Sequence, residues 1–228
     1  MTLPSTRMCF TNPAAWGGHG SHALALRYRN PTPAQLRAAR DALWSHPGLE
    51  GCWRRKDREP TPASRIACTF GLGVERPLYG IAHLPGTDGV ACDVAALVDD
   101  HGVEDDCPLC RELARHAGPP DGWLTLRLPF GGLGLAYEIG AYPCEDGTSL
   151  AWRDRVDTWL RALAEHVHRA APFDLALVGW TDGGGQLPGC VEEVSEERSI
   201  GYLFPGPCGL TWLPPTEGAP IPAGIFEE

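Results

Sequence analysis

The chain of 228 residues contains no apolar run that approaches the roughly 20 residues needed to cross a bilayer. Its first ten residues also lack the apolar core of a signal peptide, so the sequence predicts a cytoplasmic protein without membrane contact. Lysine is nearly missing, since Lys56 is the only lysine among 19 basic residues. Together with abundant Ala, Gly and Pro, this arginine bias is typical of a high-GC genome and predicts a bacterial source.

Positive charge is scarce relative to negative charge. The sequence has 19 Lys and Arg against 29 Asp and Glu, a formal net charge of −10. Because phosphate binding draws its affinity from Lys and Arg that release counterions, this balance argues against nucleic acid as a partner. An acidic surface instead suits a basic one, so we expect a protein partner with a basic surface.

Familiar catalytic patterns are missing as well, including GxSxG, HExxH, the P-loop and zinc-deaminase spacing. Their absence lowers the expectation that the chain is an enzyme and leaves that question open. The nine cysteines are an odd number, and several, such as Cys68 and Cys92, stand in apolar stretches. This usage predicts thiols that are mostly reduced and not a disulfide framework.

The clearest structural pattern lies between residues 122 and 182. Segments Trp123–Pro129 and Leu135–Ala141 are predicted as antiparallel strands joined by a glycine turn at Phe130–Gly134. Apolar residues then recur at helical spacing over Ala151–Ala171, which predicts a long amphipathic helix. The short apolar run Phe173–Trp180 is typical of a buried central strand.

The first half of the chain also shows a regular alternation of elements. A predicted strand at His22–Arg29 leads to a helix whose start has the pattern of a capping box, with Thr32 as N-cap, Pro33 at the first position and Gln35 at the third. Pro47-Gly48 ends this helix, and the strand that follows is expected to return beside the first. The remaining predictions are strands at 49–53, 64–72, 78–84 and 90–98, and a helix at about 107–117.

This order of elements predicts an α/β (α+β) fold, built from ferredoxin-like βαβ-type units in one mixed, largely antiparallel sheet with helices packed on it. We expect a loop-like N-terminal arm over 1–21 and an α/β body over 22–185. The body can be divided into two βαβ-type halves, 22–128 and 122–185. The C-terminal region, 186–228, contains an acidic run, a short predicted hairpin and a Pro-rich tail.

The most chemically suggestive stretch is Cys107-Pro-Leu-Cys110 at the start of a predicted helix. It resembles the CxxC active site of the thioredoxin and glutaredoxin families. That resemblance implies a first thiol whose pKa is lowered by the helix N-terminus and a second thiol that resolves a mixed disulfide. The acidic residues Glu104, Asp105 and Asp106 precede the motif and would oppose thiolate formation.

The same motif supports two further interpretations. Cys107 and Cys110 could form half of a zinc site, with His101 and His116 as further ligands, because zinc prefers thiolate and imidazole donors. No cofactor is assured by the sequence, and zinc is the one that it suggests. The alternative is a pair of half-buried, reduced cysteines without a chemical role.

A second candidate pocket combines His19 and His22 of a glycine-rich loop with the basic run after Trp53, which begins at Arg54 and Arg55. Histidine and arginine together could bind a small ligand. The alternatives are surface histidines and a solvated turn between strands.

Tryptophans at loops or strand ends, among them Trp16, Trp53, Trp180 and Trp212, can cap the core or anchor a partner. The leading hypothesis is a non-catalytic, cytoplasmic protein-binding protein, comparable as a class to small bacterial immunity or accessory proteins. It would use its acidic surface and loop aromatics. One alternative is a zinc or thiol-dependent enzyme centred on Cys107 and Cys110, and another is a small-ligand-binding domain.

Overall fold

The computed structural model describes residues 10–17, 20–68, 77–99, 121–137, 139, 151–181, 194, 196–207 and 209–216. Its strands are β1 (Ser21–Arg29), β2 (Leu49–Trp53), β3 (Leu78–Ala82), β4 (Val90–Asp99), β5 (Asp121–Pro129), β6 (Leu175–Thr181), β7 (Gly201–Gly206) and β8 (Gly209–Leu213). Its helices are α2 (Pro33–Ser45), α4 (Phe130–Ala136) and α5 (Ala151–Ala170), with short 3-10 helices η1 (Pro13–Trp16) and η2 (Pro62–Ser64).

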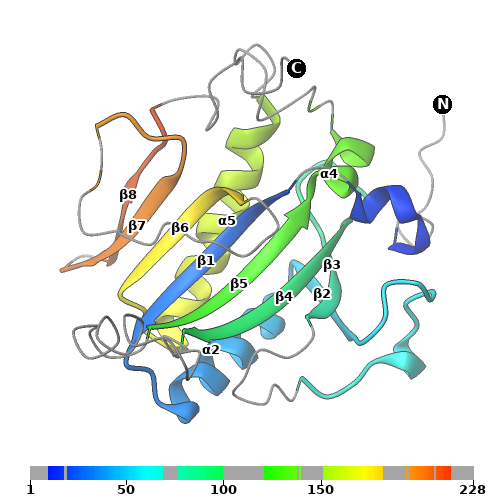
Figure 1. Cartoon of the computed structure of the whole chain (residues 1–228), viewed down its shortest axis with the longest axis horizontal. Helices are drawn as coiled ribbons and strands as arrows, with labels where there is room; N and C mark the ends of the chain where they lie inside the picture. The colour runs from blue at the N-terminus through cyan, green and yellow to red at the C-terminus, as the bar shows by residue number, and fades with distance from the viewer. Residues whose placement is uncertain are drawn as a thin grey trace, which may run out of the picture.

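The described strands form one eight-stranded sheet in the order β2-β3-β4-β5-β1-β6-β7-β8 (Figure 1). Every neighbouring pair in this sheet is antiparallel. The expected combination of helices with a largely antiparallel sheet is therefore confirmed, but among the described strands the sheet is not mixed. The short C-terminal hairpin is also confirmed, as β7 and β8.

Helices connect strands that are not neighbours in the sheet. Helix α2 lies between β1 and β2 in the chain, yet three strands separate β1 from β2 in the sheet. Likewise α5 precedes β6, and β1 lies between β5 and β6. The prediction that 49–53 returns beside the first strand is wrong, because β3, β4 and β5 lie between β1 and β2 in the sheet.

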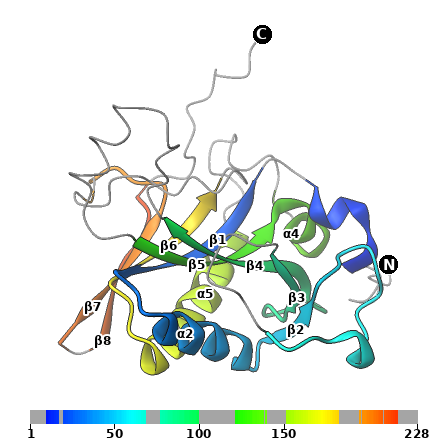
Figure 2. The ribbon, with the colours of Figure 1, turned by 60° about the horizontal axis from the view of Figure 1, so that its bottom comes forward.

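Helices α2 and α5 pack side by side on one face of the sheet, which we call the helical face (Figure 2). The predicted amphipathic helix is confirmed as α5, whose apolar stripe is fully buried. The main core lies between the two layers and includes Leu24, Leu26, Leu43, Leu124, Leu126, Val156, Leu160, Leu163 and Val167. Among the described residues, no helix combines the length and apolarity that crossing a bilayer requires.

The start of α2 follows the predicted cap in part. Thr32 Oγ1 accepts a hydrogen bond from the Gln35 backbone N–H at 3.1 Å, which satisfies one free donor of the first turn. The Gln35 side chain does not return to the cap. Its Nε2 donates to the Pro172 carbonyl at 3.1 Å, so it links α2 to the segment that follows α5.

Close packing of α2 on the sheet depends on two glycines. Gly51 and Gly80 are partners across β2 and β3, and a Cβ at either position would overlap the Trp44 ring. The bulge that follows in β2, between Gly51 and Trp53, reverses the alternation of side chains. Leu49 therefore lies on the helical face and Trp53 on the opposite face of the sheet. We call the face that carries Trp53 the second face.

The predicted glycine turn and following strand are wrong over residues 130–136, which form α4. Phe130 and Leu133 bury their side chains in the main core, and a Cβ at Gly131 would collide with the Ala14 carbonyl oxygen of η1. These glycines allow two helices to approach closely, and tertiary packing overrides their turn preference. The segment predicted as a loop-like arm thus contains η1, with Ala15 buried.

The prediction of reduced cysteines is wrong for one pair, since Cys52 and Cys68 form a disulfide with a Cα–Cα distance of 6.2 Å. Residues 65–68 are not a strand as predicted, but the Ile66 N–H donates to the Cys52 carbonyl at 3.0 Å. The disulfide joins residues that are 16 positions apart in the chain, and this hydrogen bond holds the same two segments together. Cys92 is a free thiol in the core, where burial raises its pKa.

Removal of the disulfide by Cys68→Ala should lower the free energy of unfolding by about 3 kcal/mol, because a loop of this length no longer constrains the unfolded chain. Urea unfolding of both proteins, with and without reductant, measures the effect. Reductant should destabilise the wild type and leave the variant unchanged. Equal stability of the two proteins without reductant would contradict the assignment.

Candidate functional site

The proposed thiol and zinc residues Cys107, Cys110, His101 and His116 lie outside the described residues, as does His19. Over the ranges that the structure describes, no group of three or more His, Cys, Asp or Glu side chains is placed to hold a metal ion. The candidate sites that can be built from geometry are therefore three others, one on each face of the sheet and one between the helices.

The first site is a buried polar network on the helical face. His22 of β1 has its Nε2 at 2.6 Å from Asp157 Oδ1 of α5. Arg153, one turn earlier in α5, places its Nε 3.5 Å from Asp157 Oδ2 and donates from Nη2 to the Ser199 carbonyl. All three charged or polar side chains are buried. The network therefore ties β1, α5 and the segment before β7 together.

His22 is therefore a buried residue that links β1 to α5, and it does not line a loop pocket as predicted. Its ring meets Trp152 edge to face, with 5.2 Å between centroids. The side chain lies on the helical face, whereas Trp53 lies on the second face. The structure therefore separates His22 from the Trp53 end of the proposed small-ligand pocket.

Replacing Asp157 with Ala should destabilise the fold by about 3 kcal/mol or more, because Arg153 and His22 would lose a buried carboxylate. Thermal or urea unfolding measures the loss. The matched control is Asp154→Ala, an exposed residue of the same helix, which should change stability little. If both variants unfolded together with the wild type, the network would have no role in stability.

The second site is a row of side chains across the second face. Trp53 of β2, Tyr79 of β3, Asp93 of β4 and Arg127 of β5 are successive partners in the sheet register. Arg127 donates from Nε to Asp93 Oδ1 at 2.7 Å, and its Nη2 lies 2.6 Å from the same oxygen. The ion pair thus links neighbouring strands directly.

Aromatic and cationic side chains extend this row towards η1. Trp16 meets Tyr79 edge to face at 5.1 Å between centroids, and Lys56 Nζ lies 5.5 Å from the Trp16 ring centroid. Trp16, Tyr79 and Arg127 are half-buried, and Lys56 is exposed. We call Trp16, Lys56, Tyr79, Asp93 and Arg127 the aromatic–cation patch.

Electrostatics explain why the patch contains cations. Burial raises the pKa of Asp93, and the Arg127 guanidinium and then Lys56 oppose that shift. Burial also raises the pKa of Tyr79, with a further contribution from Asp93. Only 8% of Asp93 is exposed, so the nearby cations offset part of the cost of burying its carboxylate.

The basic run after Trp53 is a solvated turn for the most part. Arg54 and Arg55 are exposed, and Arg55 forms an ion pair with Asp57 at 2.5 Å that lowers the pKa of Asp57 to about 2. Lys56 is the member of this basic run that belongs to the aromatic–cation patch, through its contact with the Trp16 ring.

Trp53 and the other predicted aromatic anchors do not gather at one place. Trp53 is 3% exposed and donates from Nε1 to the Thr61 carbonyl at 3.1 Å. Trp180 and Trp212 are half-buried and pack against the main core on the helical face. The Arg161 guanidinium lies over the Trp212 ring at 4.9 Å from its centroid. Core capping, one of the two predicted roles, therefore describes Trp53 best.

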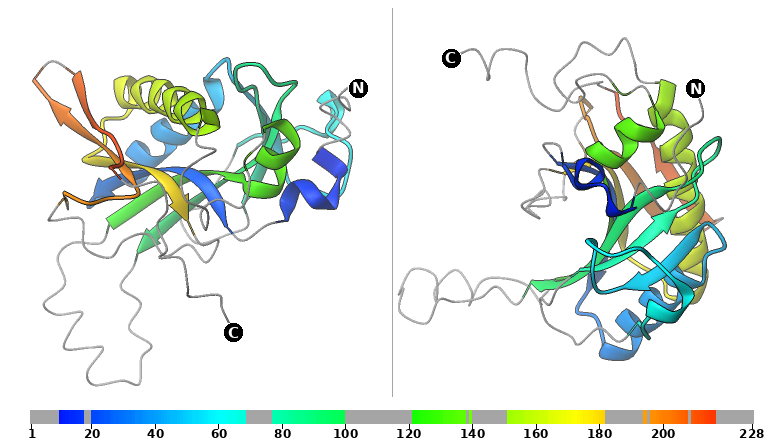
Figure 3. Two further views of the ribbon diagram at one scale, coloured as in Figure 1. Left: turned by 90° about the horizontal axis from the view of Figure 1, so that it is seen from above. Right: turned by 90° about the vertical axis from the view of Figure 1, so that its right-hand side faces the viewer.

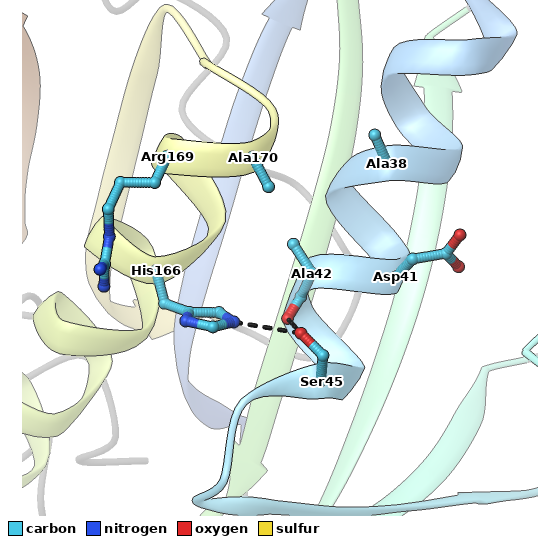
Figure 4. Close-up of a pocket in the computed structure, with 7 residues that line it drawn as sticks. All are labelled: Ala38, Asp41, Ala42, Ser45, His166, Arg169 and Ala170. Carbon is cyan, nitrogen blue, oxygen red and sulfur yellow. Dashed lines mark hydrogen bonds between the residues drawn. The ribbon is translucent and has the colours of Figure 1, made fainter.

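The third site is a groove between α2 and α5 (Figure 4). It is lined by Ala38, Asp41, Ala42, Ser45, His166, Arg169 and Ala170. Ser45 Oγ donates to the Ala42 carbonyl at 2.8 Å and lies 3.1 Å from His166 Nε2. When the hydroxyl proton is given to the Ala42 carbonyl, Ser45 Oγ accepts from the His166 tautomer that is protonated at Nε2.

In an activated serine the hydroxyl proton is instead directed to the histidine. Asp41 does not supply an orienting carboxylate either, because Arg40 holds its Oδ1 at 2.6 Å. Nearby, burial lowers the pKa of His46, with His166 and Arg169 as further causes. The described contacts of the groove do not assemble a serine–histidine–carboxylate triad.

The sequence signal for the aromatic–cation patch was present but weak. Asp93 and Arg127 interrupt the apolar patterns predicted as strands at 90–98 and 123–129, and their pairing depends on the register between β4 and β5. Comparison of the chain with protein-family models, with curated proteins and with solved structures returns no match. The site therefore rests on geometry alone.

Proposed function

We propose that this chain is a non-catalytic protein-binding protein of the accessory or immunity-like kind, which holds its partner at the aromatic–cation patch. The observation that carries the proposal is the half-buried Trp16–Tyr79 pair beside Lys56 and the Asp93–Arg127 ion pair. Trp, Tyr and Arg are the residues most enriched among those that dominate binding energy in protein interfaces.

The chemistry of the patch suggests how a partner would bind. The edge-to-face rings offer rigid apolar area at low entropic cost, and the buried ion pair offers hydrogen-bonding groups that water reaches only in part. A net charge of −10 over the chain favours a partner with a basic surface, through faster encounter more than through tighter contact. Lys56 sets local selectivity, because an acidic side chain of the partner can meet it.

The variant Tyr79→Ala should weaken partner binding by about tenfold, because it removes half of the aromatic pair. The partner is the protein recovered in stoichiometric amount from extracts of the source organism on the immobilised wild-type chain. Calorimetry with that protein then measures the affinity. The control is Arg37→Ala, an exposed position on α2 across the sheet, which should bind as the wild type does.

Two results would count against this proposal. One is the recovery of no stoichiometric partner. The other is a partner that Tyr79→Ala and Arg37→Ala bind with equal affinity, which would place the interface elsewhere.

The ferredoxin-like description, the bacterial source and the cytoplasmic location belong to the same proposal. In support of the first, α2 and α5 each join strands that run in the same direction and are separated by others in the sheet. The Cys52–Cys68 disulfide weighs against a cytoplasmic location, because disulfides persist mainly in oxidising compartments.

The alternative function, a zinc or thiol-dependent enzyme, is favoured by the Cys107-Pro-Leu-Cys110 motif. It predicts about one zinc per chain in protein purified without chelator or affinity metal, and loss of that zinc in the Cys107→Ser/Cys110→Ser variant. Elemental analysis of both proteins measures it. Wild-type protein that contains no zinc would exclude the metal site. An enzymatic activity of the wild type that survives in the Cys107→Ser/Cys110→Ser variant would exclude a thiol-dependent mechanism at this motif.

A further inference from the structure

The two edges of the sheet differ in how they are protected. On the outer edge of β2 the Ile66 N–H donates to the Cys52 carbonyl, and the disulfide holds that segment in place. At the other edge, β8 pairs with β7 on one side, and no described strand pairs with its outer side (Figures 1 and 3). An open edge strand offers unpaired backbone donors and acceptors to another strand.

The register of the β7–β8 hairpin shows which groups face outward. Pro205 has no N–H and is the partner of Leu210, so this is a non-hydrogen-bonded pair. Pair types alternate along an antiparallel ladder, so Leu203–Trp212 is also of this type. The N–H and C=O groups of Leu210 and Trp212 therefore point away from β7, to the open edge.

The β7–β8 hairpin lacks the charged side chains that usually protect an edge strand from pairing with another strand. Residues 201–213 contain no charged residue, although 21% of the chain is charged. Natural edge strands commonly carry charges, in particular lysine, that prevent pairing with another copy. Pro205 lies on β7, the inner strand, so it does not block the outer edge of β8.

The side chains hold β8 rigidly enough to act as a template. The Trp212 ring fills the space over Gly201, where a Cβ would overlap it, and the Arg161 guanidinium covers the same ring. On the other side of the hairpin, Tyr202 and Phe204 are stacked with centroids 6.1 Å apart and are half-buried. Thr211 lies exposed opposite Phe204.

We propose that β8 is a dimerisation strand, which pairs antiparallel with β8 of a second copy of this chain about a two-fold axis at Thr211. In this register Leu210 of each copy faces Trp212 of the other, so the outward groups form ~4 backbone hydrogen bonds between the copies. The two sheets become one continuous sheet. This dimer does not depend on the proposed partner-binding function.

A second copy of this chain meets two requirements of the open edge. The outward-facing groups of Leu210 and Trp212 flank Thr211, so two copies of β8 can pair through these groups about a two-fold axis. In addition, two chains that each carry a charge of −10 repel one another over most of their surface, and this hairpin is an uncharged stretch where they can meet.

The test is sedimentation velocity of the full-length, oxidised chain from nanomolar to high micromolar concentration. The wild type should shift from the monomer mass of 24.6 kDa to twice that mass as concentration rises. Thr211→Lys and Thr211→Glu should each weaken the dimer by about tenfold or more, because like charges would face each other across the axis. Thr211→Val keeps the β-branched shape and should dimerise as the wild type does.

An equimolar mixture of Thr211→Lys and Thr211→Glu should restore the dimer, because opposite charges then face each other at the axis. Circular dichroism of each variant separates loss of pairing from loss of folding. A wild type that stays monomeric at the highest concentration would overturn the proposal. A dimer that persists in Thr211→Lys, or single variants that the mixture fails to rescue, would overturn it as well.

Discussion

The antiparallel pairing of β1 with β5 and β6 is the constraint on which the rest of the structure depends. β1 is nearly fully buried along its length, with Leu24, Leu26 and Tyr28 in the core under the helices and Ala25 on the second face. Because its two neighbours occupy both edges, the connection through α2 must carry the chain to the far edge of the sheet. The four-strand meander then returns to β5 and completes the body.

Buried charge is placed on both faces of this frame, and in each case the fold supplies a partner. Asp157 meets His22 and Arg153 under the helices, and Asp93 meets Arg127 on the second face. A buried carboxylate without such a partner would be costly, so each pair constrains the elements that carry it. The two sites differ in access. The His22 network is closed, whereas the Asp93–Arg127 pair borders half-buried aromatic side chains and is therefore the better candidate for recognition.

The edges of the sheet show the same contrast between a closed and an open surface. A disulfide and a backbone hydrogen bond hold a segment against β2. The outer groups of β8 face away from the sheet, on a hairpin without charge. The aromatic–cation patch includes side chains of β3, β4 and β5 towards the β2 edge of the sheet, and β8 is the opposite edge, so binding of a partner and pairing of two copies would use separate surfaces.

Much of the fold could be predicted from local patterns in the sequence. The 3.6-residue periodicity of 151–170, the Thr32 cap and the apolar runs of β1, β4 and β6 act over a few residues, so the sequence alone determined these helices and strands. The glycines of 130–136 misled the prediction, because their small size serves the contact between α4 and η1. The order of the strands, the Cys52–Cys68 pairing and the row from Trp53 to Arg127 were decided only by the tertiary structure. Each joins residues far apart in the chain, and the bulge in β2 and the register between strands, which no local pattern carries, determine which side chains meet.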